Sequence, residues 1–415
     1  MRSLIVLLLL LAVPHAPAAA EDAHWIGSWG AAPLQPTPAF GPFPASPSFD
    51  DQTIRQVVRI SAGGTRLRLR LSNEYGTKPL AIGGASVALA KPDGTPGKKS
   101  IAVTFGGKKS AIIPPGAPLA SDPIDLPTKD LDTISVSLYV SGDTGQCTCH
   151  ATGLQDGFVS DKGDFTKKDF KPKDKISARA FLSGIAVETE KPAKTIVVLG
   201  DSISDGVGST AGADHRWPDL LAQRLSGRSD GTEWGVVNVG ISGNQILNDG
   251  AGQSALARFD RDVLAVPGAA YVIMFEGIND IGISYGNFKM PRPASATSSG
   301  PPPPPPHVTA EQLIAGYQQI IARAHGAGLK VIGATITPYK GAAYYAPEGE
   351  KVREKVNDWI RTNNAFDAVI DFDKVIRDPK DLQQMADGLH MGDHLHGSDA
   401  GYKAMADAID LSIFR

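Results

Sequence analysis

The chain has 415 residues, of which 42% are hydrophobic and 20% are charged, and its formal net charge is -3. A chain of this length has material for two or three domains and a large hydrophobic core. The near balance of 41 Lys and Arg against 44 Asp and Glu gives no electrostatic basis for binding nucleic acid or an anionic membrane.

The first twenty residues have the pattern of a secretory signal peptide. Arg2 precedes an apolar run over 4–13, and the small residues at 18–20 are typical of a cleavage site. The run is too short to span a bilayer, and no later segment reaches that length. We therefore expect a signal peptide at 1–20, a mature chain without an integral membrane segment, and a secreted or periplasmic location.

Residues 21–190 have the period-two pattern of β-strands. Apolar residues at 57–60 precede a glycine turn, and Leu then alternates with Arg over 66–71, which predicts a hairpin with one dry and one wet face. The stretch 134–140 alternates in the same way. Short alternating strands separated by turn clusters predict an antiparallel β-sandwich, of jelly-roll type, as an accessory domain.

Two features of this half leave alternatives open. The arginines of 66–70 are consistent with binding an acidic polymer, although a solvated sheet face is favoured. Trp25, Trp29 and Phe49 suit either a sugar-stacking platform or core packing, and packing is favoured.

The only cysteines, Cys147 and Cys149, are two residues apart. Export permits a disulfide between them, but that spacing on one strand is near the upper limit of Cα separation. A disulfide and two free thiols remain equally open. Without a second cysteine pair, no zinc or catalytic role is expected, and we interpret the neighbouring His150 as structural.

From residue 191 onward strands and helices alternate, after a predicted linker at 191–194. Strands are predicted at 196–199, 234–238, 271–275, 331–335 and 368–371, and helices at 217–225, 255–264, 311–327, 351–361 and 401–413. This alternation predicts a doubly wound parallel sheet. The segment 284–307 contains six consecutive prolines and predicts a mobile excursion without packed structure.

Four motifs follow the predicted strands or lie in the last loop. They are Gly200-Asp201-Ser202, Gly243, Gly277-Ile278-Asn279-Asp280 and Asp393-His394-Leu395-His396. Carboxyl ends of parallel strands meet at one edge of a sheet, where sites gather. A serine needs an imidazole to take its proton, and a carboxylate orients that imidazole. Backbone N–H groups and an amide can stabilise the oxyanion.

These motifs, in this order, resemble the GDSL/SGNH hydrolases, a family named for its Ser, Gly, Asn and His. The resemblance covers about 191–415 and implies a flavodoxin-like three-layer α/β/α catalytic domain. It implies that Ser202 is the nucleophile, His396 the general base and then acid, and Asp393 the residue that orients His396. The oxyanion hole would comprise the N–H groups of Ser202 and Gly243 with the Asn279 amide.

Two of these assignments have competitors. Asp387 and His390 repeat the Asp-x-x-His spacing, but only His396 precedes Gly-Tyr by the family's five and six residues. Gly240 competes with Gly243, and the later glycine is favoured. Clustered histidines at 390–396 also suit a metal, yet a metal would leave the Ser, Gly and Asn motifs unexplained, so neither metal nor cofactor is expected.

The sequence thus predicts an exported two-domain serine esterase acting on a small-molecule or polysaccharide ester. The favoured substrate is an acetylated carbohydrate, as for acetylxylan esterases, because no long apolar lid is visible. The alternatives are a lipase, phospholipase or arylesterase acting on acyl chains, and an inactive carbohydrate-binding protein.

Overall fold

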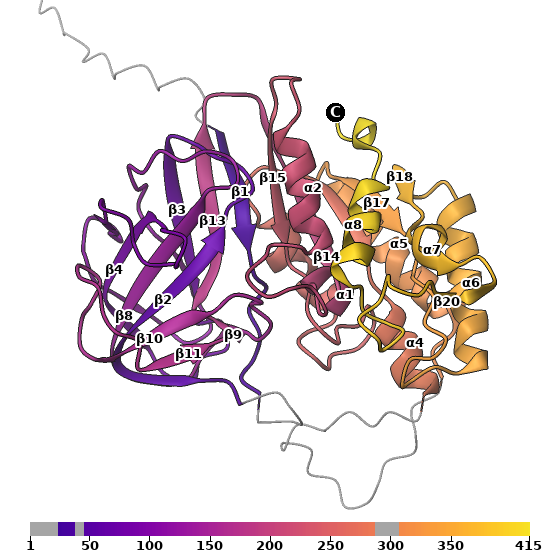
Figure 1. Ribbon diagram of the computed structural model, residues 1–415, viewed down its shortest axis with the longest axis horizontal. Coiled ribbons are helices and arrows are strands. Elements are labelled where there is room, and N and C mark those ends of the chain that lie inside the picture. Colours follow the sequence, from indigo (N-terminus) through magenta and orange to yellow (C-terminus); the bar gives the residue numbers. More distant parts are fainter. Residues whose placement is uncertain (1–23, 38–44, 287–306) are drawn as a thin grey trace, which may run out of the picture.

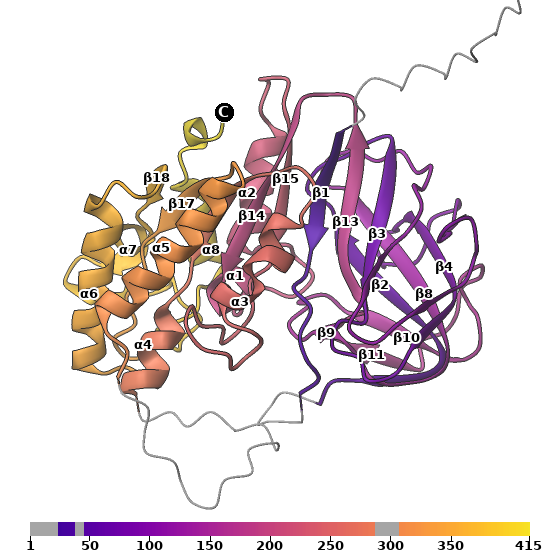
Figure 2. The same ribbon diagram turned by 180° about the vertical axis from the view of Figure 1, so that it is seen from behind.

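The computed structural model describes residues 24–37, 45–286 and 307–415. The predicted signal peptide lies outside the described residues, as does most of the predicted proline-rich excursion. Figure 1 shows a β-rich N-terminal part beside an α/β C-terminal part, and Figure 2 shows the same arrangement from behind. Among the described residues, no helix combines the length and the apolar character needed to cross a bilayer.

The N-terminal part contains antiparallel sheets around one hydrophobic core, which confirms the prediction of an antiparallel β-rich region. A four-stranded sheet has the order β1 (His24–Gly30), β13 (Leu182–Thr189), β3 (Arg66–Ser72) and β7 (Pro118–Ala120). A seven-stranded sheet contains β11 (Asp174–Ile176), β10 (Gly157–Lys162), β2 (Ser48–Arg59), β8 (Thr133–Gln146), β4 (Leu80–Leu89), β5 (Ile101–Ala102) and β6 (Ala111–Ile113). The short strands β9 (Cys149–His150) and β12 (Arg179–Ala180) pair separately.

The predicted hairpin of 57–60 with 66–71 is wrong, because β2 and β3 lie in different sheets. The glycine turn between them hydrogen-bonds to other segments: Gly64 N–H donates to Thr128 O, and Thr65 N–H donates to Glu188 O. A Cβ on Gly64 would lie 2.3 Å from Glu188 O, so only glycine permits this approach. The chain therefore crosses from one sheet to the other.

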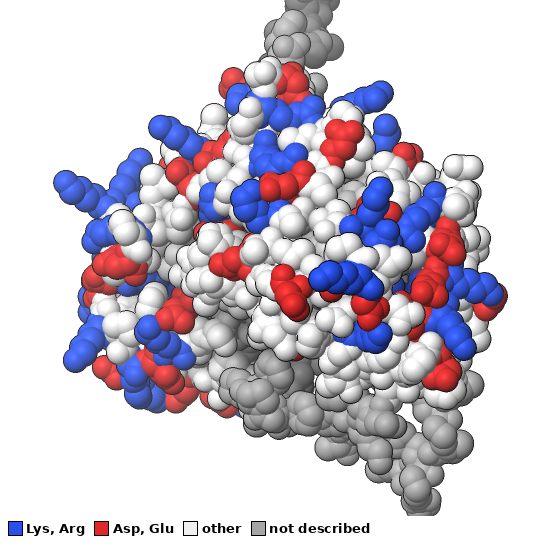
Figure 3. Space-filling view, turned by 45° about the vertical axis from the view of Figure 1, so that its right-hand side comes forward, with Lys and Arg blue, Asp and Glu red and all other residues white. Residues whose placement is uncertain are grey.

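The arginine stripe of β3 is paired rather than simply solvated. Arg66 donates to Glu188 at 2.6 Å, and the Arg68 guanidinium lies 4.4 Å from the centre of the Trp25 ring. Trp29 and Phe49 are buried, which supports packing over a sugar platform. On the face in Figure 3, basic and acidic side chains are interspersed, so this face has no patch of a single charge.

Cys147 and Cys149 form a disulfide with a Cα–Cα distance of 5.3 Å. Cys147 lies between β8 and β9 instead of within a strand, so the backbone bends and brings the two Cα atoms into the range that disulfides require. The structure thus decides between the two alternatives that the sequence left open.

The C-terminal part has a five-stranded parallel sheet, as predicted. Its order is β15 (Glu233–Asn238), β14 (Ala193–Gly200), β16 (Ala269–Phe275), β17 (Lys330–Ala334) and β18 (Ala368–Ile370). In chain order this is 2-1-3-4-5, the flavodoxin-like arrangement. The predicted linker is too long, because Ala193 and Lys194 already belong to β14.

Helices cover both faces of this sheet: α2 and α8 lie on one face in Figure 1, and α3 and α5 lie on the other in Figure 2. The helices are α1 (Ser202–Asp205), α2 (Trp217–Ser226), α3 (Ala255–Phe259), α4 (Ile278–Tyr285), α5 (Ala310–Gly326), α6 (Pro347–Thr362), α7 (Phe372–Ile376) and α8 (Asp399–Asp407). Two predicted helices are shorter than expected. The helix predicted at 255–264 is α3 followed by a π turn over 260–264. The helix predicted at 401–413 ends at Asp407, before a 3-10 turn at 411–413. A two-stranded ribbon, β19 (Arg377–Asp378) and β20 (Asp381–Met385), completes the fold.

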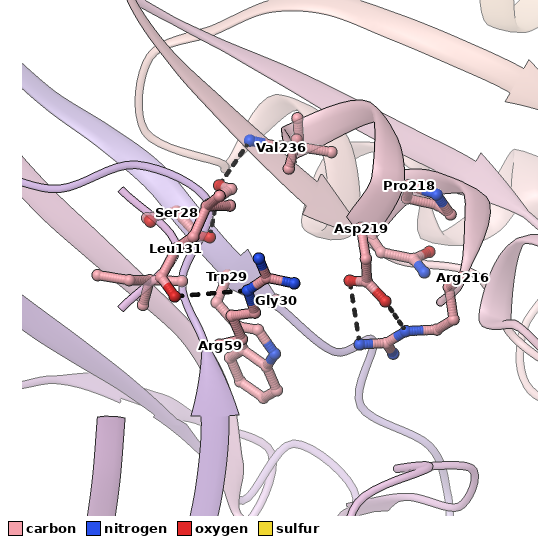
Figure 4. A pocket seen from close by; sticks show the side chains of 13 residues that line it. Ser28, Trp29, Gly30, Arg59, Leu131, Arg216, Pro218, Asp219 and Val236 are labelled. Carbon is pink, nitrogen blue, oxygen red and sulfur yellow. Dashed lines mark hydrogen bonds and ion pairs between the residues drawn. The ribbon is translucent and has the colours of Figure 1, made fainter. Parts of the chain in front are cut away.

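The two parts pack directly against each other. Gly27 of β1 donates to the Thr195 hydroxyl at 3.0 Å, and Val236 N–H donates to the Ser61 hydroxyl at 2.8 Å. Figure 4 shows a hollow at this interface, where the Arg216 guanidinium pairs with Asp219 on α2. None of the predicted site residues lines this hollow.

Candidate active site

Ser202 lies where β14 ends, at the switch point of the sheet. A Cβ on Gly200 would come within 2.7 Å of Phe275 O, so glycine permits the tight turn out of the strand. The Asp201 carboxylate then caps α1 by accepting from Ile203 N–H at 2.9 Å. Gly206, with φ of 98°, ends the helix after one turn. This geometry presents Ser202 at the carboxyl edge of the sheet, as predicted for open α/β folds.

The structure brings Ser202, His396 and Asp393 together from positions 194 residues apart. His396 Nε2 is 2.8 Å from Ser202 Oγ, and His396 Nδ1 is 2.6 Å from Asp393 Oδ2. The other carboxylate oxygen, Oδ1, accepts from the backbone N–H groups of Leu395 and His396 at 3.1 and 3.0 Å. A carboxylate that accepts from Nδ1–H leaves Nε2 free to accept the serine proton.

Asp393 is held as a carboxylate. Burial by itself would raise its pKa, but the hydrogen bonds from the His396 side chain and backbone and from Leu395 hold the pKa well below its usual range. The group that orients His396 therefore stays charged throughout the neutral range.

The competing pair, Asp387 and His390, does not form. His390 Nδ1 instead accepts from the N–H groups of Gly392 and His394 at 3.0 and 3.3 Å. Its Nε2 is buried without a hydrogen-bond partner among the described residues, and burial lowers the His390 pKa. The ring packs 4.3 Å from that of His394. His390 therefore shapes the loop that carries His396.

The predicted oxyanion donors come from three segments: Ser202 is the first residue of α1, Gly243 lies in the loop after β15, and Asn279 lies in the first turn of α4. Within the described chain, the backbone N–H groups of Ser202 and Gly243 donate no hydrogen bond. Gly240 N–H, in contrast, donates to Asn238 Oδ1 at 2.9 Å and is not available, which favours Gly243. The Asn279 amide uses one of its two N–H bonds to reach Asn244 O at 2.9 Å. Its second N–H donates to none of the described residues.

Buried carboxylates lie around these segments. Asp280 accepts from Ile246 N–H at 2.8 Å and from Leu247 N–H at 3.0 Å, and so anchors the loop that follows Gly243. Burial raises the Asp280 pKa to about 7, against the opposing effect of these hydrogen bonds. Burial, and then the charge of Asp201, also raise the pKa of Glu276, whose nearest cation is Arg258 at 3.8 Å. Asp280 therefore holds the loop through hydrogen bonds, whereas neither carboxylate oxygen of Glu276 has a hydrogen-bond partner among the described residues.

In the part of the chain that the structure describes, no three His, Cys, Asp or Glu side chains are grouped so that they could hold a metal ion. Of the clustered histidines, His396 contacts Asp393 and Ser202, His390 accepts from backbone N–H groups, and the His394 ring packs against that of His390. The expected lack of a metal and of a cofactor stays a prediction.

Sequence reasoning missed three residues beside the site. Asp205 accepts from the Ser242 N–H and hydroxyl at 3.1 and 2.7 Å, and His150 Nε2 lies 2.9 Å from the other oxygen of Asp205. Asp205 lies three residues after Ser202 and Ser242 directly precedes Gly243, so their closeness to these two motifs is a usable signal. Nothing in the spacing of His150 links it to them, because it lies in the N-terminal part.

Comparison with solved structures gives distant matches. An α/β hydrolase from the Lake Arreo metagenome is 22% identical over 53% of this chain and 94% of its own, with a TM-score of 0.39. An acetyl xylan esterase from Geobacillus stearothermophilus is 21% identical over 53% and 94%, with a TM-score of 0.38. A lipase/acylhydrolase from Enterococcus faecalis is 20% identical over 52% and 92%, with a TM-score of 0.34.

No curated protein sequence matches the chain. A family profile, the "GDSL-like Lipase/Acylhydrolase family", matches residues 198–404. The matched range begins within β14, just before Ser202, and ends within α8, just after His396, so it contains every residue of the predicted site. The resemblance inferred from the four motifs is confirmed: the C-terminal half of this chain belongs to the GDSL-like lipase/acylhydrolase family.

Proposed function

We propose that this protein is a serine esterase that uses Ser202, His396 and Asp393 as its catalytic triad. The observation that carries the proposal is the continuous chain of hydrogen bonds from Ser202 Oγ through His396 to Asp393, with distances of 2.8 and 2.6 Å. This is the geometry that an activated serine nucleophile requires.

In the first half of the reaction, Ser202 Oγ attacks the ester carbonyl carbon while His396 Nε2 takes the hydroxyl proton. The negative charge moves to the carbonyl oxygen, where the N–H groups of Ser202 and Gly243 and the Asn279 amide stabilise it. The tetrahedral intermediate collapses, the bond to the alcohol oxygen breaks, and His396 gives its proton to the departing alcohol. The acyl group remains on Ser202.

In the second half, water attacks the acyl carbon and His396 takes one of its protons. Collapse breaks the bond to Ser202 Oγ, which takes back the proton, and the carboxylic acid leaves. Asp393 keeps its charge throughout and stabilises the imidazolium that forms in each half. No other group is required for this cycle.

The substrate that we favour is an O-acetylated carbohydrate. Large apolar side chains exposed in the described part of the chain are Leu89, Ile112, Val369, Leu382 and Met391. Only Met391 belongs to the loop that carries His396, so the described surroundings offer little surface for a long acyl chain. A lipase or arylesterase is the alternative.

The N-terminal sheets would form the accessory domain of a secreted or periplasmic enzyme, with the jelly-roll type of sandwich that the sequence suggests. Their two layers share one core, in keeping with such a sandwich. The mixed charge on the face in Figure 3 is compatible with a neutral polysaccharide and offers no basic tract for nucleic acid.

The test is an ester panel run on the wild type and on Ser202→Ala. We expect hydrolysis of p-nitrophenyl acetate and release of acetate from acetylated xylan by the wild type, and neither by the variant. Faster cleavage of long-chain esters than of acetate would replace the carbohydrate assignment with that of a lipase. A wild type without activity on any ester would favour a binding protein.

A further inference from the structure

His150 and Asp205 form a buried pair that joins the two parts of the molecule. His150 belongs to β9. Figures 1 and 2 show β9 on the side of the N-terminal part that faces α1. Its Nε2 is 2.9 Å from Asp205 Oδ1, and both side chains are at most 6% exposed. A buried ionisable pair of this kind is costly unless every polar atom is satisfied.

The hydrogen bonds of His150 assign it the role of a donor. Its Nδ1 lies 3.0 Å from the carbonyl oxygen of Ala32, which can only accept, so Nδ1 carries a hydrogen. Its Nε2 faces the Asp205 carboxylate, so both ring nitrogens are engaged in hydrogen bonds. A ring with acceptors on both sides has no free nitrogen to act as a base.

The other oxygen of Asp205 fixes Ser242. Oδ2 accepts from the Ser242 N–H at 3.1 Å and from its hydroxyl at 2.7 Å. Ser242 is the residue whose carbonyl shares a peptide unit with the Gly243 N–H. A turn bond from Asn244 N–H to Ile241 O at 3.0 Å closes this loop.

The N-terminal part also contacts the loop at a second point, since the hydroxyls of Thr152 and Ser242 are 3.2 Å apart. β9 itself is fixed by the Cys147–Cys149 disulfide, by pairing with β12, and by Leu34 N–H, which donates to Cys149 O at 2.9 Å. His150 is therefore presented from a rigid support.

From these contacts we propose that His150 is a positioning residue that acts across the domain interface. Through Asp205 and Ser242 it fixes the direction of the Gly243 N–H, and hence one donor of the oxyanion hole. The catalytic part of this inference rests on the proposed esterase function, whereas the ordering of the loop does not. The N-terminal part would accordingly be required for turnover and not only for binding substrate.

The test compares two amide replacements of different length. In His150→Asn the amide stands at the position of Nδ1 and can donate to Ala32 O but cannot reach Asp205. In His150→Gln the amide stands at the position of Nε2 and can donate to Asp205. Ser61→Ala is the matched control, because it removes an interdomain hydrogen bond, to Val236 N–H, away from the loop.

Two measurements are made on the full chain. For p-nitrophenyl acetate, His150→Asn should lower kcat by about 10- to 100-fold with little change in KM, a part of the loss expected on removing an oxyanion donor. His150→Gln and Ser61→Ala should stay within about threefold of the wild type. Hydrogen–deuterium exchange over 239–247 should accelerate in His150→Asn and not in the other two.

Equal kcat values and equal exchange for His150→Asn and His150→Gln would overturn the inference. Faster exchange in His150→Asn at unchanged kcat would overturn its catalytic part. If the wild type hydrolyses no ester, the proposed function fails, and the exchange comparison still decides whether His150 holds the loop.

Discussion

Two His–carboxylate pairs flank the single turn of α1, and they differ in what the second ring nitrogen meets. At the start of the helix, His396 is oriented by Asp393 and faces the Ser202 hydroxyl, a group that can give up a proton. At its end, His150 faces Asp205 on one side and a carbonyl oxygen on the other, and both only accept. The same residue types therefore form a base in one pair and a fixed donor in the other.

The two pairs also differ in origin. His396 and Asp393 lie three residues apart in one loop, so their contact is local. His150 and Asp205 come from different parts of the fold, so their contact depends on how β9 and α1 are packed. The chemical role of each histidine thus follows from the atoms that it contacts. How well each contact withstands a change in domain packing follows from whether its two residues are close in the chain.

The largest loss of kcat should come from removing His396, which acts as the base in the first pair. His396→Ala removes the group that takes the serine proton, and we expect kcat to fall by about 10⁴-fold or more. His390→Ala is the matched control, because its imidazole supports only the loop, and its kcat should fall by about tenfold at most. Steady-state kinetics with p-nitrophenyl acetate measures both. An inactive His390→Ala beside an active His396→Ala would reverse the assignment.

The orienting carboxylate of the first pair should matter next. Asp393→Asn keeps the shape but presents an amide to Nδ1, which favours the wrong tautomer, and kcat should fall by about 10³- to 10⁴-fold. Because the pKa of Asp393 is depressed, its contribution to stability is present above its unfolded pKa and is lost as pH falls through the folded value. In acid denaturation, the free energy of unfolding of the variant should therefore lack the loss that protonation of Asp393 causes in the wild type. Wild-type kcat in Asp393→Asn would contradict the triad.

The donor side, which the second pair supports, should give a smaller loss. Asn279→Ala removes an amide donor, and we expect kcat to fall by about 10²- to 10³-fold with KM little changed. Tyr344→Phe provides the comparison, since its hydroxyl makes only a long contact of 3.3 Å to Asn279 Oδ1. That variant should stay within about threefold of the wild type. Similar values for the two variants would exclude Asn279 as a donor.

Substitution of Asp280 should have the smallest effect on turnover, but it should change how the free energy of unfolding depends on pH. Its folded pKa of about 7 is above its unfolded value, so the protonated acid stabilises the fold below the unfolded pKa, and this contribution is lost as pH rises through about 7. In Asp280→Asn the fall in unfolding free energy between about pH 4 and 7 should become shallower. It should not vanish, because burial raises the pKa of Glu276 in the same direction. Denaturant unfolding across this range would measure the slope, and a slope equal to that of the wild type would contradict the assignment.

The sequence alone determined the local features of this protein. Hydrophobic periodicity predicted the parallel strands and the helices between them, since burial of one face has a characteristic period in each element. The motifs at 200–202, 277–280 and 393–396 predicted which loops carry the site. The preference for Asp393 and His396 over Asp387 and His390 came from the family resemblance, whose Gly-Tyr spacing only His396 meets, and the observed hydrogen bonds agree with it.

Only the tertiary structure decided which distant segments are neighbours. Period-two alternation could not assign β2 and β3 to different sheets, because the same pattern buries one face whichever strand lies alongside. The alternation pattern also could not place His150 against Asp205. A periodic pattern describes residues within one element, and these two residues lie in different parts of the fold. Their contact arises from the packing of β9 on α1, which is a property of the folded interface and not of either segment.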